Sequence, residues 1–124
     1  MSGFERLIIE TETAEVDCWV EVARTNEEHE RGLMGRTNLP ERFGMLFMES
    51  RPVAKRMWMR GTPIPLDIVF IDPDWRILRI EHSAAPESEK MIWSFGLSQA
   101  VLELPGGTCR SLGIEKMNPV SLAR

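Results

Sequence analysis

Residues 66–81 read LDIVFIDPDWRILRIE, and this stretch indicates the class of fold that the rest of the chain must fit. Residues 66–71 are apolar apart from Asp67, a composition typical of a strand that is buried on both faces. Asp72, Pro73 and Asp74 favour a tight turn, after which residues 76–81 mix apolar and charged side chains as a returning strand does. The stretch therefore predicts a β-hairpin.

The segment before the hairpin adds a strand and a helix. Residues 16–22 alternate with a period of two, which turns Cys18 towards the protein interior. Thr25 and Glu28 have the spacing of a capping box, in which each side chain satisfies a backbone amide at the start of a helix. We expect this helix to run to about Met34.

The remaining elements are predicted to be short. Strands are expected at residues 44–48, 53–60 and 100–104 and near Val120. Residues 108–112 predict one helical turn, capped by Thr108 and ended by Gly113. Residues 83–96 follow neither period, so we expect a long loop there, able to lie over a pocket. Together these elements predict a β-rich α+β fold, a compact and partly closed β-barrel with two short helices, in one domain over residues 1–124.

Composition places the chain among ordinary soluble proteins. Of its 124 residues, 43% are apolar and 27% are charged. The longest apolar runs, such as residues 68–71, are far shorter than the roughly 20 residues that a membrane-spanning helix needs. The first residues have neither the basic start nor the apolar stretch of a secretory signal. We expect a cytoplasmic protein, or a periplasmic or exported one if a signal has been removed.

Charge is distributed unevenly along the chain, whose net charge is −4. Residues 1–30 hold nine carboxylates and two arginines, whereas residues 31–124 hold thirteen basic and ten acidic side chains. Nonspecific binding to nucleic acid depends mostly on basic side chains that neutralise phosphates, so we expect no nucleic-acid partner. Twelve of the fifteen basic residues are arginines, which suit bidentate pairing with carboxylate or phosphate. Small anions therefore stay candidate ligands.

Cysteines and histidines are too few and too scattered for a metal site. The chain has Cys18, Cys109, His29 and His82, and none of the spacings typical of zinc sites. It also lacks the glycine-rich motifs of nucleotide-binding proteins and the Gly-x-Ser-x-Gly motif of hydrolases. We expect two reduced thiols, no metal and no cofactor.

Two carboxylates, Asp67 and Glu103, are flanked by apolar residues in predicted strands. A carboxylate buried in such surroundings is costly unless it is paired or hydrogen-bonded. We expect Arg60, Thr62 or nearby backbone amides to bind Asp67. Either the two carboxylates brace the loop at residues 61–65, or they form the polar floor of a ligand pocket, where a raised pKa would suit one of them to acid or base chemistry.

Arg56, Trp58 and Arg60 fall on one face of the predicted strand at residues 53–60. This arrangement places two guanidinium groups beside an aromatic plane, which suits an anionic or sugar-like ligand. The alternative is that Trp58 belongs to the core and the arginines are solvated. Trp19, on the polar face of its strand, is a candidate for an exposed aromatic residue.

Four segments carry a resemblance to a known family. They are RGLM at residues 31–34, GMLF at 44–47, WMRGTPIPLDIVFID at 58–72, and VLELPGG at 101–107 with LGI at 112–114. These segments resemble the DUF192 family, an uncharacterised group of small bacterial and archaeal proteins. The central motif of that family usually reads Trp-Met-Lys-Asn-Thr, so Arg60 and Gly61 replace a lysine and an asparagine here. The resemblance implies the fold and brings no established catalytic residues.

Three functional hypotheses follow. The first is a binding or accessory domain for a small anionic or carbohydrate ligand, in a pocket framed by Arg56, Trp58, Arg60, Thr62, Asp67 and Glu103. The second is a hydrolase or lyase that uses Asp67 and Glu103 as an acid–base pair. The third is a protein-interaction module that uses the acidic amino-terminal third of the chain around Trp19.

Overall fold

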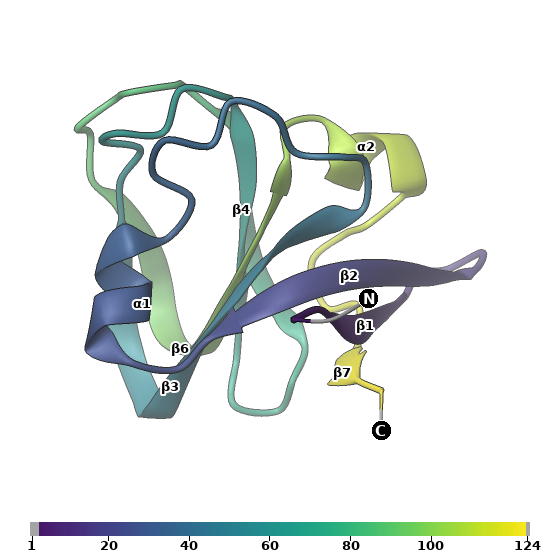
Figure 1. Ribbon diagram of the computed structural model, residues 1–124. Helices are drawn as coiled ribbons and strands as arrows, with labels where there is room; N and C mark the ends of the chain where they lie inside the picture. The colour runs from purple at the N-terminus through teal and green to yellow at the C-terminus, as the bar shows by residue number, and fades with distance from the viewer. Residues whose placement is uncertain (1–2, 124) are drawn as a thin grey trace.

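The computed structural model describes residues 3–123, which form one curled seven-stranded sheet and two short helices (Figure 1). The strands are β1 (Glu5–Glu10), β2 (Glu15–Ala23), β3 (Phe43–Met57), β4 (Leu66–Ile71), β5 (Ile77–Ala84), β6 (Ile92–Pro105) and β7 (Val120–Leu122). The helices are α1 (Asn26–Arg31) and α2 (Thr108–Leu112). The predicted β-rich α+β class with a partly closed barrel is confirmed.

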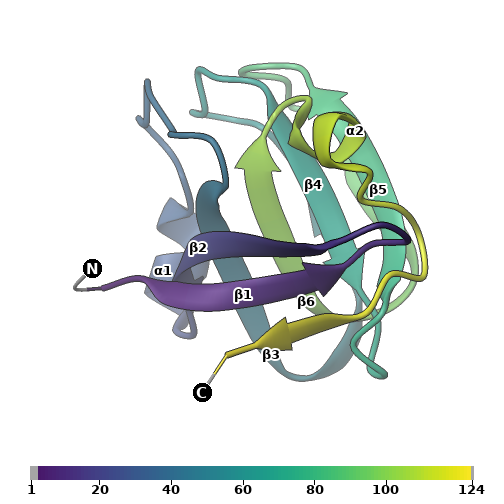
Figure 2. The same ribbon diagram turned by 90° about the vertical axis from the view of Figure 1, so that its right-hand side faces the viewer.

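The strands follow the order β5-β4-β6-β3-β2-β1-β7 in the sheet. β2 and β3 are parallel and are joined through α1, and the other neighbours are antiparallel. The two edges of the sheet approach each other near the start of β5 (Figure 2). There the amide of Ile77 donates to the carbonyl of Asn118 (3.0 Å), and the amide of Val120 donates to that of Trp75 (2.8 Å). These bonds hold the sheet in its half-barrel shape.

Two hydrophobic cores lie on opposite faces of the sheet. Every residue of β4 is buried, as predicted for a strand covered on both sides. Successive side chains of a strand point to opposite faces, so Val69 joins one core and Ile68 the other. We call the cluster around Val69 and Leu102 the first core, and the cluster around Ile68 and Phe47 the second core.

The hairpin of β4 and β5 is confirmed, but the strands at residues 44–48 and 53–60 need correction. They form the single strand β3, which is interrupted by an irregularity between Met48 and Val53 and ends at Met57. β1 was not among the expected strands, although its Leu7 and Ile9 are fully buried.

The long loop expected at residues 83–96 is also wrong. β5 continues to Ala84 and β6 already begins at Ile92, which leaves a loop of residues 85–91. The alternation at the start of β6 is hidden because its exposed positions are apolar, namely Trp93, Phe95 and Leu97, whereas two buried ones are serines, Ser94 and Ser98. Hydrophobicity alone therefore cannot locate this strand.

The helices begin and end for identifiable reasons. The Thr25 hydroxyl accepts a hydrogen bond from the Glu28 amide (3.1 Å), and the Glu28 carboxylate accepts one from the Thr25 amide (3.0 Å), which confirms the capping box. α1 ends at Arg31 instead of about Met34, because Gly32 adopts a φ of 44°. α2 ends at Gly113 as predicted.

The start of α2 differs from the prediction. Thr108 is its first residue, and the cap position is occupied by Gly107, which has no side chain to accept a hydrogen bond. The amides at the start of this helix therefore need an acceptor from elsewhere in the chain.

Candidate functional site

A cavity of about 650 Å³ lies between α1, β3 and the loop that joins β3 to β4. Of the six residues that the sequence singled out, five line it: Arg56, Trp58, Arg60, Thr62 and Glu103. The sixth, Asp67, is not part of its wall. We call this space the Glu103 cavity.

Glu103 lies in the middle of β6, opposite Met45 of β3 and Ile68 of β4, and so faces the second core. It is only 4% exposed. Within residues 3–123 its carboxyl group has no hydrogen-bond or ion-pair partner, although it lines the cavity. Burial raises the pKa of this carboxyl from its usual 4.5 to about 8. The group is therefore largely protonated at neutral pH.

Thr62 is the second buried polar residue of the cavity and is 6% exposed. Its backbone is held firmly, because its amide donates to the carbonyl of Met59 (3.0 Å) and its carbonyl accepts from the amide of Glu87 (2.9 Å). Its hydroxyl has no hydrogen-bond partner in the part of the chain that the structure describes. Thr62 thus offers the cavity a hydroxyl on a fixed backbone.

The loop at residues 85–91 forms part of the cavity wall through Met91. The Glu87 carboxylate accepts a hydrogen bond from the Gly61 amide (2.9 Å), and the Ser88 carbonyl accepts one from the Met59 amide (2.9 Å). These bonds tie the loop to the segment that carries Thr62. The expected lid is therefore a shorter, hydrogen-bonded wall.

The exposed part of the cavity wall carries three arginines and a tryptophan, and one exposed carboxylate, Glu30. Trp58 is 41% exposed, so it does not belong to the core, and the guanidinium group of Arg60 lies 5.4 Å from the centre of its ring. Lys55 is paired with Glu49 (2.6 Å), but Arg31, Arg56 and Arg60 form no ion pair within residues 3–123. Their positive charge is therefore available to a ligand.

Asp67 has a different role from the one expected. It is fully buried on the first-core side of β4. Its carboxylate accepts hydrogen bonds from the backbone amides of Ser83 (2.8 Å), Gly107 (3.1 Å) and Cys109 (2.8 Å). Of the expected partners, neither Arg60 nor Thr62 is hydrogen-bonded to it, and the backbone amides that bind it come from distant parts of the chain instead of from the adjacent loop. Asp67 thus supplies the cap that α2 lacks in its own sequence.

The predicted acid–base pair of Asp67 and Glu103 is not assembled. Asp67 pairs with Leu104 across the β4–β6 ladder, and Glu103 pairs with Ile68. Residues directly opposite each other in a ladder share a face, so the two carboxyl groups project to opposite sides of the sheet. They cannot act on one substrate in a common pocket.

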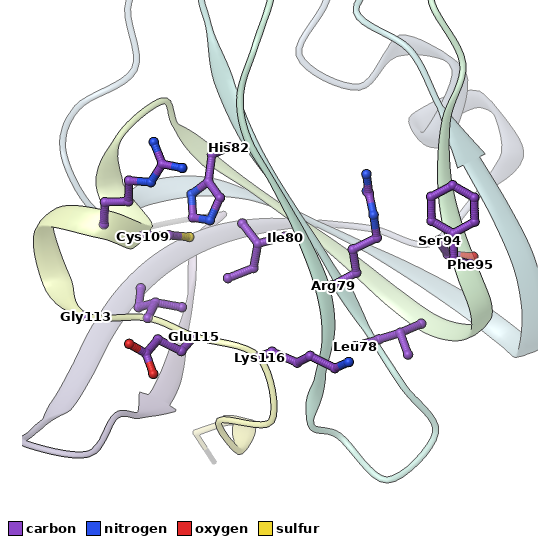
Figure 3. A pocket seen from close by; sticks show the side chains of 12 residues that line it. Leu78, Arg79, Ile80, His82, Ser94, Phe95, Cys109, Gly113, Glu115 and Lys116 are labelled. Atoms are coloured by element: carbon purple, nitrogen blue, oxygen red, sulfur yellow. The ribbon is translucent and has the colours of Figure 1, made fainter.

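A second cavity, of about 610 Å³, lies beside α2 and β5 (Figure 3). Figure 3 shows Cys109 and His82 on the side of α2, and Arg79 nearer to Phe95. Burial, together with the negative charge of the neighbouring Asp67 carboxylate, raises the pKa of Cys109 well above its usual value. The thiol is therefore a poor nucleophile at neutral pH.

The other thiol is equally unreactive. Cys18 and Cys109 are both free and buried, as expected for reduced cysteines. Burial raises the pKa of Cys18 to about 11. Within residues 3–123, no group of three or more His, Cys, Asp or Glu side chains is arranged to hold a metal ion. No helix in that range is both long and apolar enough to span a membrane.

Comparison with known proteins identifies the family. The model of the DUF192 family, described as an uncharacterized ACR, matches residues 7–122. The chain belongs to the DUF192 family. No curated protein is similar to the chain at a significant level.

Two crystal structures share the DUF192 fold closely. A protein of unknown function from Novosphingobium aromaticivorans DSM 12444 is 36% identical, with a TM-score of 0.93 over 95% of this chain and 84% of that one. A proposed transcription regulator from Sinorhizobium meliloti 1021 is 35% identical, with a TM-score of 0.93 over 96% of this chain and 93% of that one.

The departure from the usual family motif at Gly61 keeps its backbone conformation. Gly61 has a φ of 75°, which is in the left-handed region. Asparagine, the residue usual in DUF192 proteins at this position, tolerates that region better than most residues with a Cβ. Both residues are therefore compatible with the turn that presents Thr62 to the cavity.

Several cavity residues were not recognised from the sequence as part of a site. They are His29, Arg31, Leu33, Met34, Phe47 and Met91. Most of them come from α1, the segment after it and the start of β3, which meet Trp58 and Thr62 only in the folded chain. The family segments RGLM and GMLF contain four of them, and this was the available signal.

Proposed function

We propose that this DUF192 domain binds, in the Glu103 cavity, a small organic anion that carries hydroxyl groups, such as a sugar acid. The observation that carries the proposal is that Glu103 and Thr62, both buried at this cavity, have no hydrogen-bond partner within residues 3–123. The side-chain oxygens of these two residues are not sealed from solvent, since the fully buried atoms without a partner in the described chain are Arg79 Nη1 and His82 Nδ1. Water or a ligand in the cavity must therefore satisfy them. A ligand in the cavity would satisfy both groups at once.

The chemistry of the two groups favours hydroxyl ligands. Because its pKa is about 8, the Glu103 carboxyl keeps its proton at neutral pH and offers one donor and additional acceptor capacity. The Thr62 hydroxyl offers a donor and an acceptor as well. A ligand hydroxyl, which is itself both donor and acceptor, matches either group.

The mouth of the cavity favours a negative charge on the same ligand. Arg31, Arg56 and Arg60 line it without ion-pair partners in the described chain, and guanidinium groups bind carboxylates with two parallel hydrogen bonds. Trp58 adds a partly exposed flat ring on which a sugar ring can lie. A ligand with hydroxyl groups at the floor of the cavity and a carboxylate at its mouth is a sugar acid.

The other hypotheses are less well supported by this geometry. The hydrolase or lyase hypothesis needs Asp67 and Glu103 on one side of the sheet, and they lie on opposite sides. The interaction-module hypothesis is supported by Trp19, which is 38% exposed on β2, and it stays a prediction.

The test uses two substitutions that remove the polar groups and keep their shape. Thr62→Val and Glu103→Leu replace unpartnered polar groups with apolar ones, a change that is nearly neutral or stabilising for the folded chain. Thr108→Val is the matched control, because Thr108 is also 6% exposed but lies in α2, away from the cavity. Calorimetric titration measures binding of D-galacturonate, and urea denaturation measures stability without ligand.

We expect the parent chain to bind D-galacturonate more tightly than D-galactose, which lacks the carboxylate, or glutarate, which lacks hydroxyls. Thr62→Val and Glu103→Leu should lose this binding while they match or exceed the parent in stability, a pattern typical of binding groups that are unsatisfied without ligand. Thr108→Val should bind as the parent does. Absence of galacturonate binding by the parent, or unchanged binding by both cavity variants, would refute the proposal.

A further inference from the structure

Three exposed aromatic residues lie at the end of β3 and the start of β6, and the last of them, Phe95, also lines the second cavity. Trp58, Trp93 and Phe95 are 41%, 42% and 75% exposed. Trp58 follows the end of β3 and lines the cavity, and Trp93 lies directly opposite the cavity residue Arg56 in the β3–β6 ladder. Phe95 is two residues further along β6. We call Trp58, Trp93 and Phe95 the aromatic track.

Each ring of the aromatic track has an arginine beside it. The distances from guanidinium carbon to ring centre are 5.4 Å for Arg60 and Trp58, 5.8 Å for Arg56 and Trp93, and 5.1 Å for Arg79 and Phe95. Arg79 is also paired with Glu81, whereas Arg56 and Arg60 form no ion pair within residues 3–123. Flat apolar surfaces lie here beside positive charges, of which those of Arg56 and Arg60 lack an ion-pair partner within residues 3–123.

Phe95 is held outward by a built backbone feature. Its φ is 53°, a left-handed conformation that is unfavourable for a bulky residue. The neighbouring Ser94 is only 1% exposed, and its hydroxyl accepts from the Lys55 amide (2.9 Å) and donates to the Gly96 carbonyl (2.7 Å). The hydrogen bonds of Ser94 therefore fix the backbone that carries Phe95.

We propose that the aromatic track binds the further units of an acidic oligosaccharide whose terminal unit occupies the Glu103 cavity, an inference that rests on the function proposed above. The terminal unit lies on Trp58 in the cavity, the apolar faces of the further sugar rings stack on Trp93 and Phe95, and Arg56 meets the carboxylate of the unit on Trp93. The cavity and the track are continuous, which supports this extension. Trp58 lines the cavity and is part of the track, and Arg56 lines the cavity and lies beside the ring of Trp93.

Charge argues against the two other occupants that such a surface suggests. A two-fold contact between two copies would bring the same patch against itself, so that the unpaired arginines of both copies would meet. Single-stranded nucleic acid needs many basic contacts to its phosphates, whereas this chain has a net charge of −4 and two unpaired arginines along the track.

The test compares D-galacturonate with its linear tetramer by calorimetric titration. Phe95→Asn removes one ring and keeps the left-handed backbone, which asparagine tolerates. Trp93→Thr removes a second ring with a residue that favours strands, and neither residue lines the Glu103 cavity. Trp19→Thr is the matched control, since Trp19 is a strand tryptophan of similar exposure, 38%.

We expect the parent to bind the tetramer at least about tenfold more tightly than the monomer, a factor equal to roughly 1.4 kcal/mol. Phe95→Asn and Trp93→Thr should lose this gain and still bind the monomer as the parent does, while Trp19→Thr keeps both affinities.

If the monomer is bound and the tetramer is bound no more tightly, or if the gain survives both substitutions, the track is not a binding surface and the cavity proposal stands. If neither saccharide binds, both proposals are wrong. If the parent binds a thymidine octanucleotide more tightly than the tetramer, the surface binds nucleic acid and the inference is overturned. If the parent is a dimer that Phe95→Asn dissociates, the surface binds a second copy and the inference is overturned as well.

Discussion

Replacement of Asp67 tests how one strand residue holds α2 in place. Its carboxylate oxygens accept three backbone hydrogen bonds, two on Oδ1 from Ser83 and Gly107 and one on Oδ2 from Cys109. Asp67→Asn keeps one oxygen and replaces the other with an amide that faces a backbone N–H. Asp67→Leu removes both acceptors.

The structure gives the order of the two effects. In Asp67→Leu the buried Cys109 amide is left unsatisfied, at a cost of about 2 kcal/mol. The Ser83 and Gly107 amides are partly accessible, so water can replace the carboxylate and the cost is about 1 kcal/mol each. The free energy of unfolding should therefore fall by about 4 kcal/mol in total. In Asp67→Asn one oxygen still serves its amides, so we expect a loss of about 2 kcal/mol. The leucine variant is therefore the less stable one, although leucine suits an apolar strand.

Urea denaturation of the parent and both variants measures these differences. Asp74→Asn is the matched control, because Asp74 is exposed in the turn between β4 and β5 and its side chain makes no hydrogen bond within residues 3–123. Hydrogen exchange adds a local measurement, in which the Gly107 and Cys109 amides should lose protection in Asp67→Leu. A leucine variant as stable as the parent, or more stable than the asparagine variant, would refute the capping role.

Three further predictions concern stability. Gly44→Ala should prevent folding or cost at least about 3 kcal/mol, since a Cβ on Gly44 would lie 2.0 Å from the Glu103 carbonyl oxygen. Soluble yield and the urea midpoint measure this loss. The control is Gly35→Ala, where the Cβ meets no atom within 4 Å and the positive φ alone should cost only about 1 kcal/mol. Thr25→Ala should cost about 1 kcal/mol by removing the acceptor of the capping box, and an unchanged urea midpoint would contradict this. The pKa of Glu103 in the folded protein, about 8, lies above its usual 4.5. The contribution of this carboxyl to the free energy of unfolding is therefore fully present below pH 4.5 and is lost as the pH rises to 8. The stability of Glu103→Gln relative to the parent should therefore rise by on the order of 4 kcal/mol between pH 5 and pH 9, and a difference that does not change with pH would show that Glu103 titrates normally.

The parts of the fold that the sequence predicts are those specified by neighbouring residues. The hairpin at residues 66–81, the capping box of Thr25 and Glu28, and the stop at Gly113 each depend on contacts within a few residues. The start of β6 does not, because Trp93 and Phe95 are exposed apolar residues and reverse the expected pattern. Their placement depends on a surface property that local periodicity does not encode.

The candidate site shows the same division. A carboxylate flanked by apolar residues identifies Glu103 and Asp67 as unusual, and both are buried. The face on which each lies depends on the pairing of β4 with β6, and the partners of Asp67 include amides 40 and 42 residues away. One residue therefore faces the cavity and the other caps a helix, a distinction that requires the tertiary structure.

The central claim is that Glu103 is a protonated carboxyl that meets a ligand. An NMR titration of its side-chain carboxyl carbon, assigned with Glu103→Gln and repeated with saturating D-galacturonate, tests this most directly. We predict an apparent pKa near 8 in the free protein, and a higher pKa in the complex because a bound anion favours the protonated form. Titration near the usual value of 4.5, or a resonance that galacturonate does not shift, would contradict the account.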